Sequence, residues 1–157
     1  MMQPTAPLVE FLSKSPFFGG IEPAAAEFLT EQFTERRYAK GETVVREGEP
    51  GRSMFIVHTG VLHLCRLKPD GQAMRLRLIH QGDFVGATAL VDMEPRPFTV
   101  VADQESVLLE LTCQDLYKLY RKDLKAWSMV VMNINRELCR HLRSAGQLVS
   151  RLMEGKE

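Results

Sequence analysis

The sequence predicts a mainly β domain, a sandwich or jelly roll, with helices at both ends. The first observation is a series of short apolar segments between Glu42 and Thr112, separated by turn residues such as Gly, Pro and Asp. Short strands at such regular spacing are typical of antiparallel sandwiches and rolls. The second observation is a proline-free stretch, 124–153, in which apolar residues recur every three or four positions, as they do in a helix.

The composition is that of an ordinary globular protein. The chain has 157 residues, 45% hydrophobic and 25% charged, which is enough to bury one core. Its formal net charge is zero, so the molecule as a whole has no electrostatic attraction to nucleic acid or membrane. No apolar run is long enough to span a bilayer, and three scattered cysteines argue for a reducing compartment. We therefore expect a cytoplasmic protein without a cofactor or structural metal.

The N-terminal region predicts two helices. A short helix over 8–12 ends before Pro16, because the residue that precedes a proline avoids helical geometry. Pro23 suits the first position of a second helix, which continues over 24–33. We expect residues 36–41 to end this second helix in a turn.

Seven strands are predicted after this turn. They cover residues 43–45, 54–58, 61–67, 74–79, 84–85, 99–102 and 107–111. Lys68-Pro69-Asp70-Gly71 predicts a hairpin turn, because proline presets one backbone angle and glycine takes the positive one. The alternating residues of 74–79 suit a half-buried strand.

Two helices are predicted to close the chain. Thr112 followed by Asp115 is a hydroxyl cap with an acid three residues later, which predicts a helix start. The longer helix runs over 124–153 and carries apolar residues at alternating spacings of four and three. The apolar positions are Trp127, Val131, Ile134, Leu138, Ala145, Leu148 and Leu152, and His141 takes the position between Leu138 and Ala145. Such spacing predicts a coiled-coil dimer seam, the alternative being a stripe that covers the chain's own core. His141 is either a pH sensor in this seam or a tolerated polar residue.

Residues 81–100 have the ingredients of an anion site. Gly86 opens a short apolar helical turn, 87–91, whose first N–H groups would lack partners within the helix. Arg96 adds a planar, permanently charged guanidinium suited to phosphate oxygens. The alternative is a surface loop in which Arg96 pairs with a neighbouring carboxylate.

A pattern of short segments is spread over residues 40–102. The segments are Lys40-Gly41-Glu42-Thr43-Val44, Gly48-Glu49-Pro50-Gly51, Met54-Phe55-Ile56-Val57, Gly60-Val61-Leu62, Gly82-Asp83-Phe84-Val85-Gly86, Ala89-Leu90, Pro95-Arg96 and Thr99-Val100-Val101-Ala102. Together they resemble the cyclic-nucleotide-binding domain, and more specifically the sensor half of CRP/FNR-type regulators. The resemblance covers residues 10–150. It implies a double-stranded β-helix with N-terminal helices in 1–123, a phosphate-binding cassette, and a dimer-forming helix in 124–157.

The resemblance also implies a ligand site, in which Arg96 meets the cyclic phosphate. Its residues are Gly86, Ala87, Thr88, Ala89, Arg96, Pro97, Phe98 and, on the last helix, Ser144. Ala87 departs from the family, which usually has a glutamate there to accept a hydrogen bond from the ribose 2′-hydroxyl. Pro97 offers neither the backbone N–H nor the hydroxyl usual at its position, and Phe98 replaces a small residue. The adenine-capping hydroxyls of the family fall near Ala145 and Gly146, beside Ser144.

These departures weaken a nucleotide site. Losing two or three hydrogen bonds, some of them to a charged phosphate, costs on the order of 3–5 kcal/mol, or several hundredfold in affinity. We therefore expect a non-enzymatic, ligand-sensing regulatory domain with a degenerate cassette, which binds cyclic nucleotide weakly or binds a different small anion. The alternatives are a regulator half that binds cAMP or cGMP normally, and a ligand-free dimerising module with a protein partner.

Other function classes have less support. The family's helix-turn-helix would follow the long helix and has no room before Glu157, so DNA binding by this chain alone is not expected. An iron–sulfur cluster needs about four nearby cysteines, which the sequence does not supply. Ser53, His58 and Asp83 are not spaced as a recognisable catalytic triad, so we expect no enzymatic activity.

Overall fold

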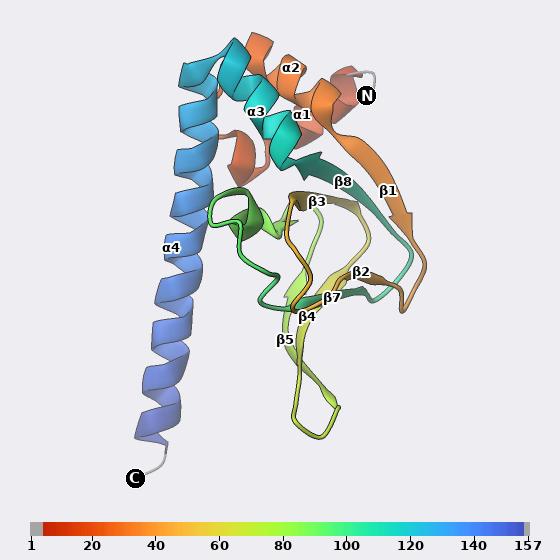
Figure 1. Cartoon of the computed structure of the whole chain (residues 1–157), viewed down its shortest axis with the longest axis vertical. Coiled ribbons are helices and arrows are strands. Elements are labelled where there is room, and N and C mark those ends of the chain that lie inside the picture. The colour runs from red at the N-terminus through yellow and green to blue at the C-terminus, as the bar shows by residue number, and fades with distance from the viewer. Residues whose placement is uncertain (1–4, 156–157) are drawn as a thin grey trace.

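The computed structural model describes residues 5–155. Residues 1–4 of the predicted 1–123 segment and residues 156–157 of the predicted 124–157 segment lie outside it. Two antiparallel four-stranded sheets form a roll, with helices at one end and one long helix along its side (Figure 1). The predicted fold class, a mainly β jelly roll with flanking helices and a long last helix, is confirmed.

Helices at the N-terminus form as predicted. Helix α1 spans Ala6–Ser13, the 3₁₀ turn η1 spans Pro16–Phe18, and α2 spans Pro23–Gln32. Each begins with a proline in its first turn, where the missing N–H costs nothing. Both phenylalanines of η1 are buried, so this turn anchors the helical end of the molecule to the core.

The turn predicted for residues 36–41 is wrong in its first half. Thr34–Tyr38 is strand β1, which pairs antiparallel with the last strand from Thr34↔Glu110 to Tyr38↔Ser106. Four of its five residues are exposed because β1 lies at the edge of its sheet, so no apolar alternation marks it in the sequence. Tertiary pairing, and not local propensity, forms this strand.

The seven predicted strands are all present. They are β2 (Thr43–Val45), β3 (Ser53–Thr59), β4 (Leu62–Leu67), β5 (Ala73–Ile79), β6 (Phe84–Val85), β7 (Thr99–Ala102) and β8 (Ser106–Thr112). One sheet has the order β1-β8-β3-β6 and the other β2-β7-β4-β5. The hairpin turn between β4 and β5 is confirmed by the hydrogen bond from Gly71 N to Lys68 O, at 2.9 Å, and by the positive φ of Gly71.

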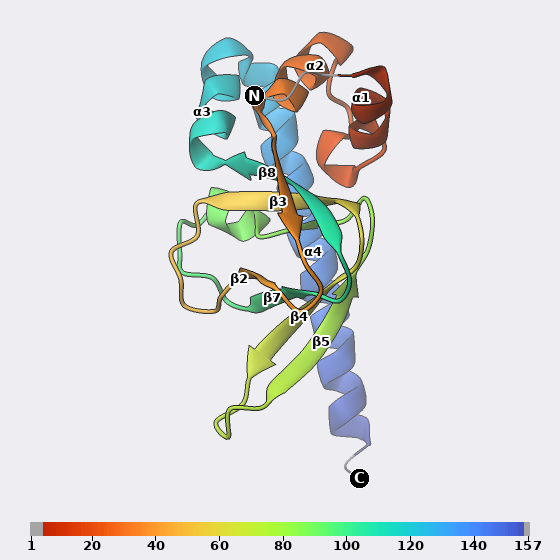
Figure 2. The same cartoon turned by 90° about the vertical axis from the view of Figure 1, so that its right-hand side faces the viewer.

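Strand β3 separates two apolar cores. Its residues Met54 and Ile56 belong to the core shared with the helices, whereas Phe55 and Val57 belong to the core between the sheets. Because both faces of β3 are covered, its sequence is continuously apolar and not alternating. Strand β5 behaves differently: apart from Ile79 it is exposed, so the predicted half-buried strand is wrong. It forms the edge of its sheet, and the β4–β5 hairpin projects away from the end of the roll that carries α1, α2 and α3 (Figures 1 and 2).

The two C-terminal helices also form as predicted. Helix α3 spans Cys113–Lys122 and begins with a complete capping box between Thr112 and Asp115. Helix α4 spans Leu124–Glu154 and lies along the roll, as both views show (Figures 1 and 2). Within residues 5–155, neither α4 nor any other helix has the apolar length that a membrane crossing requires.

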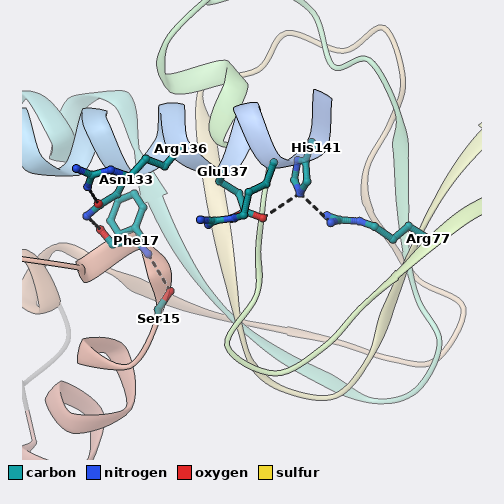
Figure 3. Close-up of polar contacts among 8 residues, drawn as sticks. Ser15, Phe17, Arg77, Asn133, Arg136, Glu137 and His141 are labelled. Carbon is teal, nitrogen blue, oxygen red and sulfur yellow. Dashed lines mark hydrogen bonds and ion pairs between the residues drawn. The ribbon is translucent and has the colours of Figure 1, made fainter. Parts of the chain in front are cut away.

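Asn133 fastens α4 to the N-terminal end of the fold. Its buried amide nitrogen donates to the carbonyl oxygens of Phe17, at 3.1 Å, and Gly19, at 2.8 Å. Its own oxygen accepts a hydrogen bond from Arg136 at 2.8 Å (Figure 3). These bonds fix the first half of α4 against η1, and thereby fix which α4 residues face the roll further along.

Candidate ligand-binding site

The loop after β6 makes a tight turn at Gly86. This glycine has φ +80°, a conformation that costs a residue with a side chain roughly 1–2 kcal/mol. The helical turn predicted for 87–91 is a single 3₁₀ turn, η2, over Ala87–Leu90. Four residues build only a small helix dipole, so the predicted anion site at the first N–H groups of this turn stays a prediction. The positive charge of this loop comes from Arg96.

Arg96 is buried, with 6% of its surface exposed. Its Nη1 donates to the carbonyl oxygen of Gly86 at 3.3 Å and its Nη2 to Ser53 Oγ at 3.4 Å, both long for hydrogen bonds. Two backbone bonds hold the residue in place: Arg96 N donates to Glu49 O, and Gly48 N to Arg96 O, each at 2.8 Å. Burial lowers the pKa of the guanidinium from its usual value. Even so, an arginine remains charged in a protein.

No carboxylate forms an ion pair with Arg96 within residues 5–155, where all ion pairs involve other cations, and Glu110 and Glu49 attract its charge only from a greater distance. The alternative of a surface loop with an Arg96 ion pair is therefore wrong. A buried charge without a counter-charge is costly, and such charges are retained where a ligand supplies the opposite charge. The position of Arg96 thus favours an anion site over a structural role.

Glycine is required at position 86 for a second reason. A Cβ on Gly86 would overlap Nη1 of Arg96 and would lie 3.2 Å from the carbonyl oxygen of Ser53. The absent side chain therefore lets the guanidinium pass close to the backbone. This close approach couples the turn at Gly86 to the placement of Arg96.

A cavity of about 120 Å³ lies between the loop, the sheet and α4. Six predicted ligand residues line it: Gly86, Ala87, Thr88, Arg96, Pro97 and Phe98. Two predicted ligand residues do not. Ala89 is buried in the other direction, against Gly51, and Ser144 is exposed on α4 beyond the cavity.

The sequence does not predict the polar wall of this cavity. Arg77 of β5 and Glu137 of α4 line it, and His141, a residue of the predicted dimer seam, lies between them (Figure 3). Arg77 Nη1 is 2.8 Å from His141 Nε2, and Glu137 Oε1 is 3.0 Å from the same nitrogen. The alternating arginines of 74–79 are the only sequence signal for a role of Arg77. No local pattern predicts that β5 contacts a helix residue 64 positions away.

One nitrogen cannot accept a hydrogen bond from Arg77 and donate one to Glu137 at the same time. Burial lowers the pKa of His141, the positive charges of Arg77 and Arg140 lower it further, and Asp83 opposes them. A lowered pKa favours the neutral ring, in which Nε2 accepts from Arg77 and Nδ1 carries the proton. Glu137 is occupied by an ion pair with Arg140. In this wall Arg77 therefore donates a hydrogen bond to a neutral His141, and the charge of Glu137 beside them is neutralised by Arg140.

The predicted dimer seam is only partly exposed. Ile134 is fully buried in the chain's own core, and Trp127 and Leu138 pack against that core, so for these residues the alternative of core covering is confirmed. His141 faces Arg77, whereas Ala145, Leu148 and Leu152 are exposed. A second row, shifted by one residue, repeats the four-three spacing and is exposed throughout: Ser128, Met132, Asn135, Cys139, Leu142, Gly146, Val149 and Met153.

The site residues do not form a metal centre. Over the described part of the chain, no three His, Cys, Asp or Glu side chains gather closely enough to hold an ion. The polar side chains that line the cavity are two guanidiniums, one imidazole, the hydroxyl of Thr88 and one carboxylate already in an ion pair. Such a set favours an anion over a cation.

Comparison with known proteins gives a consistent answer. Residues 35–123 match the family model described as cyclic nucleotide-binding domain. The chain is 30% identical over 131 residues to the cyclic AMP receptor protein of Thermus thermophilus, covering 83% of this chain and 59% of that protein. It is 29% identical over 135 residues to the CRP-like cAMP-activated global transcriptional regulator of Mycobacterium tuberculosis, covering 85% and 56%. The chain thus spans less than two thirds of the length of these curated relatives.

Solved structures show the same fold. The catabolite activator protein of Thermus thermophilus superposes with a TM-score of 0.78 at 29% identity, over 88% of this chain and 63% of that one. The regulatory domain of Toxoplasma gondii PKA, crystallised with cAMP, gives a TM-score of 0.66 at 25% identity, over 71% and 42%. The jelly roll is therefore shared with these proteins.

Proposed function

This chain belongs to the cyclic nucleotide-binding domain family, and from this premise we propose that it is a regulatory sensor whose cavity binds a small anion through Arg96. The observation that carries the proposal is the buried guanidinium of Arg96, with which no carboxylate of residues 5–155 forms an ion pair. An anionic ligand would supply the missing charge and two or more charge-assisted hydrogen bonds. The role is regulation and not catalysis, in line with the names of the two relatives.

The cavity is poorly equipped for a cyclic nucleotide. Pro97 lines it without a backbone N–H, and Ala87 lines it without a carboxylate for the ribose. Phe98 also lines it and takes up space. The resulting cavity, about 120 Å³, is well below the roughly 300–1,000 Å³ of ordinary ligand pockets. We infer that cyclic AMP and cyclic GMP bind in the millimolar range or not at all.

Helix α4 is the element that would transmit binding. Glu137, Leu138 and His141 form one wall of the cavity, so a ligand inside it contacts α4 directly. The exposed row that contains Met132, Leu142 and Val149 continues along the outer side of this helix. We propose that a second copy of the chain packs against this row as a coiled coil, because four-three spacing suits that geometry. Ligand binding would then shift how the two copies of α4 pack.

A thermal-shift titration tests the ligand proposal. Cyclic AMP, cyclic GMP, cyclic di-GMP and inorganic phosphate are each added from micromolar to millimolar concentration at constant ionic strength. A bound ligand stabilises by RT ln(1 + [L]/Kd), about 2.7 kcal/mol at a hundredfold excess over Kd. We expect saturable stabilisation by phosphate or by millimolar cyclic nucleotide. Saturation at micromolar cyclic nucleotide would contradict the degenerate cassette, and silence towards every anion would contradict the sensor.

A further inference from the structure

Two guanidiniums share the cavity. Arg96 reaches it from the loop after η2, and Arg77 reaches it from β5 on another wall. Within residues 5–155 neither forms an ion pair; the partner recorded for Arg77 is His141 Nε2, at 2.8 Å. Arg75, two positions earlier on the same strand, is different because it pairs with Asp103 at 3.0 Å and does not line the cavity.

The charges around the cavity do not cancel. Glu137 is the lining carboxylate, and it is already paired with Arg140. His141 has a pKa lowered by burial and by the neighbouring arginines, so it adds no positive charge at neutral pH and removes none. The cavity is left with the positive charges of Arg77 and Arg96. A ligand with a single negative charge would compensate the buried Arg96 and leave Arg77, which is exposed, without a counter-charge.

The rest of the lining sets the size and character of the ligand. Most of it is apolar, with side chains from Val45, Leu64, Phe84, Val85, Phe98 and Leu138. A cavity of roughly 150 Å³ holds a molecule the size of benzene. At about 120 Å³, this one suits a short organic ion better than a whole nucleotide.

We propose that the cavity selects a small dianion, with one negative charge against Arg96 and the other against Arg77. The inference rests on the proposed function, namely that the cavity binds an anion through Arg96. It goes further in giving the ligand two charges and in making Arg77 the residue that distinguishes a dianion from a monoanion. Because Arg77 contacts His141, the ligand charge that binds Arg77 would also affect α4.

Matched ligand pairs test this inference at pH 7.5 and constant ionic strength. The first pair is glutarate and pentanoate, which share a five-carbon chain and differ in one carboxylate. The second pair is methyl phosphate and dimethyl phosphate, which differ in charge on one phosphate group. Dissociation constants are measured by thermal-shift titration for the wild type and for the variants Arg77→Gln, Arg75→Gln and Arg96→Gln. Arg75→Gln is the control, because it removes the same charge from the same strand outside the cavity.

We expect the doubly charged member of at least one pair to bind about tenfold or more tightly than its partner. Arg77→Gln should bring the two members of that pair to similar affinity, and Arg75→Gln should keep the difference. A preference found only for glutarate over pentanoate would mean that the ligand carries its two charges on separate groups. A preference found only for methyl phosphate over dimethyl phosphate would mean that both charges lie on one group. Equal binding within both pairs, a preference that survives Arg77→Gln, or no binding by any of the four overturns the inference. Binding that depends on Arg96 but ignores the second charge leaves the proposed function standing and removes this inference alone.

Discussion

Nη1 of Arg96 donates a hydrogen bond to the backbone carbonyl of Gly86 across 3.3 Å, ten residues back along the same loop. The bond is long, and the guanidinium it holds is buried. An anion in the cavity would offer Arg96 shorter, charge-assisted bonds in place of this one. We therefore expect a bound anion to replace this contact, and we propose that Gly86 and Arg96 act together in binding it.

Gly86→Ala should abolish the response to anions. The new Cβ would overlap Nη1 of Arg96 and displace the guanidinium, while φ +80° adds strain of about 1–2 kcal/mol. Gly82→Ala is the control, because Gly82 has a similar φ of +86° with nothing within 4 Å of its Cβ position. Both variants should lose stability in urea denaturation, and Gly86→Ala should lose at least as much as Gly82→Ala because of the added overlap. Only Gly86→Ala should lose the anion-dependent thermal shift, and an unchanged shift in that variant would refute the coupling.

Pro97→Ser should strengthen cyclic nucleotide binding. The substitution restores a backbone N–H and adds a hydroxyl at the cavity wall, and each hydrogen bond to a charged phosphate contributes about 1.5–3 kcal/mol. We expect the Kd for cyclic AMP, measured by calorimetry, to fall about tenfold or more. Pro95→Ser, outside the cavity, should leave the Kd unchanged. Equal affinities for Pro97→Ser and the wild type would mean that the missing donor is not what weakens the site.

Asn133→Ala should lower the free energy of unfolding by about 1–3 kcal/mol. The carbonyls of Phe17 and Gly19 would lose the donor they now share. Asn135→Ala is a suitable control, because this residue has the same chemistry and helix but is exposed. Its effect should stay within about 0.5 kcal/mol in the same urea titration, as for surface substitutions generally. Alanine favours a helix more than asparagine does, so a loss in Asn135→Ala as large as that in Asn133→Ala would show that the buried bonds of Asn133 do not set the effect.

Leu142→Lys should separate the proposed dimer. Leu142 is 74% exposed in the middle of the exposed row, so a charge there would disrupt a coiled coil without disturbing the chain's own core. Light scattering at micromolar concentration should give the mass of one chain, against two for the wild type. Ser144→Lys, an exposed position about half a turn away on α4, should remain dimeric. A dimer that persists in Leu142→Lys would place the interface elsewhere.

The lowered pKa of His141 predicts a pH dependence of stability. Its neutral ring is favoured in the folded state, and the unfolded state binds the proton more readily, with the usual pKa of 6.5. The contribution of His141 to stability is therefore complete above that value and is lost as the pH falls through the lowered folded-state pKa. Replacing the residue with glutamine should flatten this part of the melting-temperature profile. A profile identical to that of the wild type would mean that other groups cause the change.

Much of the fold is predictable because local chemistry marks it. Turn residues separate the strands, and the hydroxyl–acid pair of Thr112 and Asp115 predicts the start of α3. Arg96 was also predictable, since a permanent cation after a glycine turn is a chemical signal in itself. Strand β1 gave no such signal: as an exposed edge strand it has charged residues where an internal strand would show alternation.

Features that depend on which surfaces meet could not be predicted. Two rows on α4 have the same four-three spacing and differ by one residue, so spacing alone does not show that Ile134 faces the core while Leu142 faces outward. The cavity wall likewise depends on α4 passing β5, which brings Arg77 to His141 across 64 positions of sequence. Asn133 sets that alignment through its bonds to η1, a contact visible only in three dimensions.

The most direct test of the account compares Arg96→Met with the wild type, with and without a saturating anion. A buried charge kept for a ligand is costly in the empty protein, so replacing it with an apolar side chain should leave the free energy of unfolding unchanged or raise it by about 1–4 kcal/mol. The same substitution should remove the stabilisation that the anion gives the wild type. That pair of results is the one we predict. A variant that is strongly destabilised when empty, yet is still stabilised by the anion, would show that Arg96 is a structural residue and that the anion binds elsewhere.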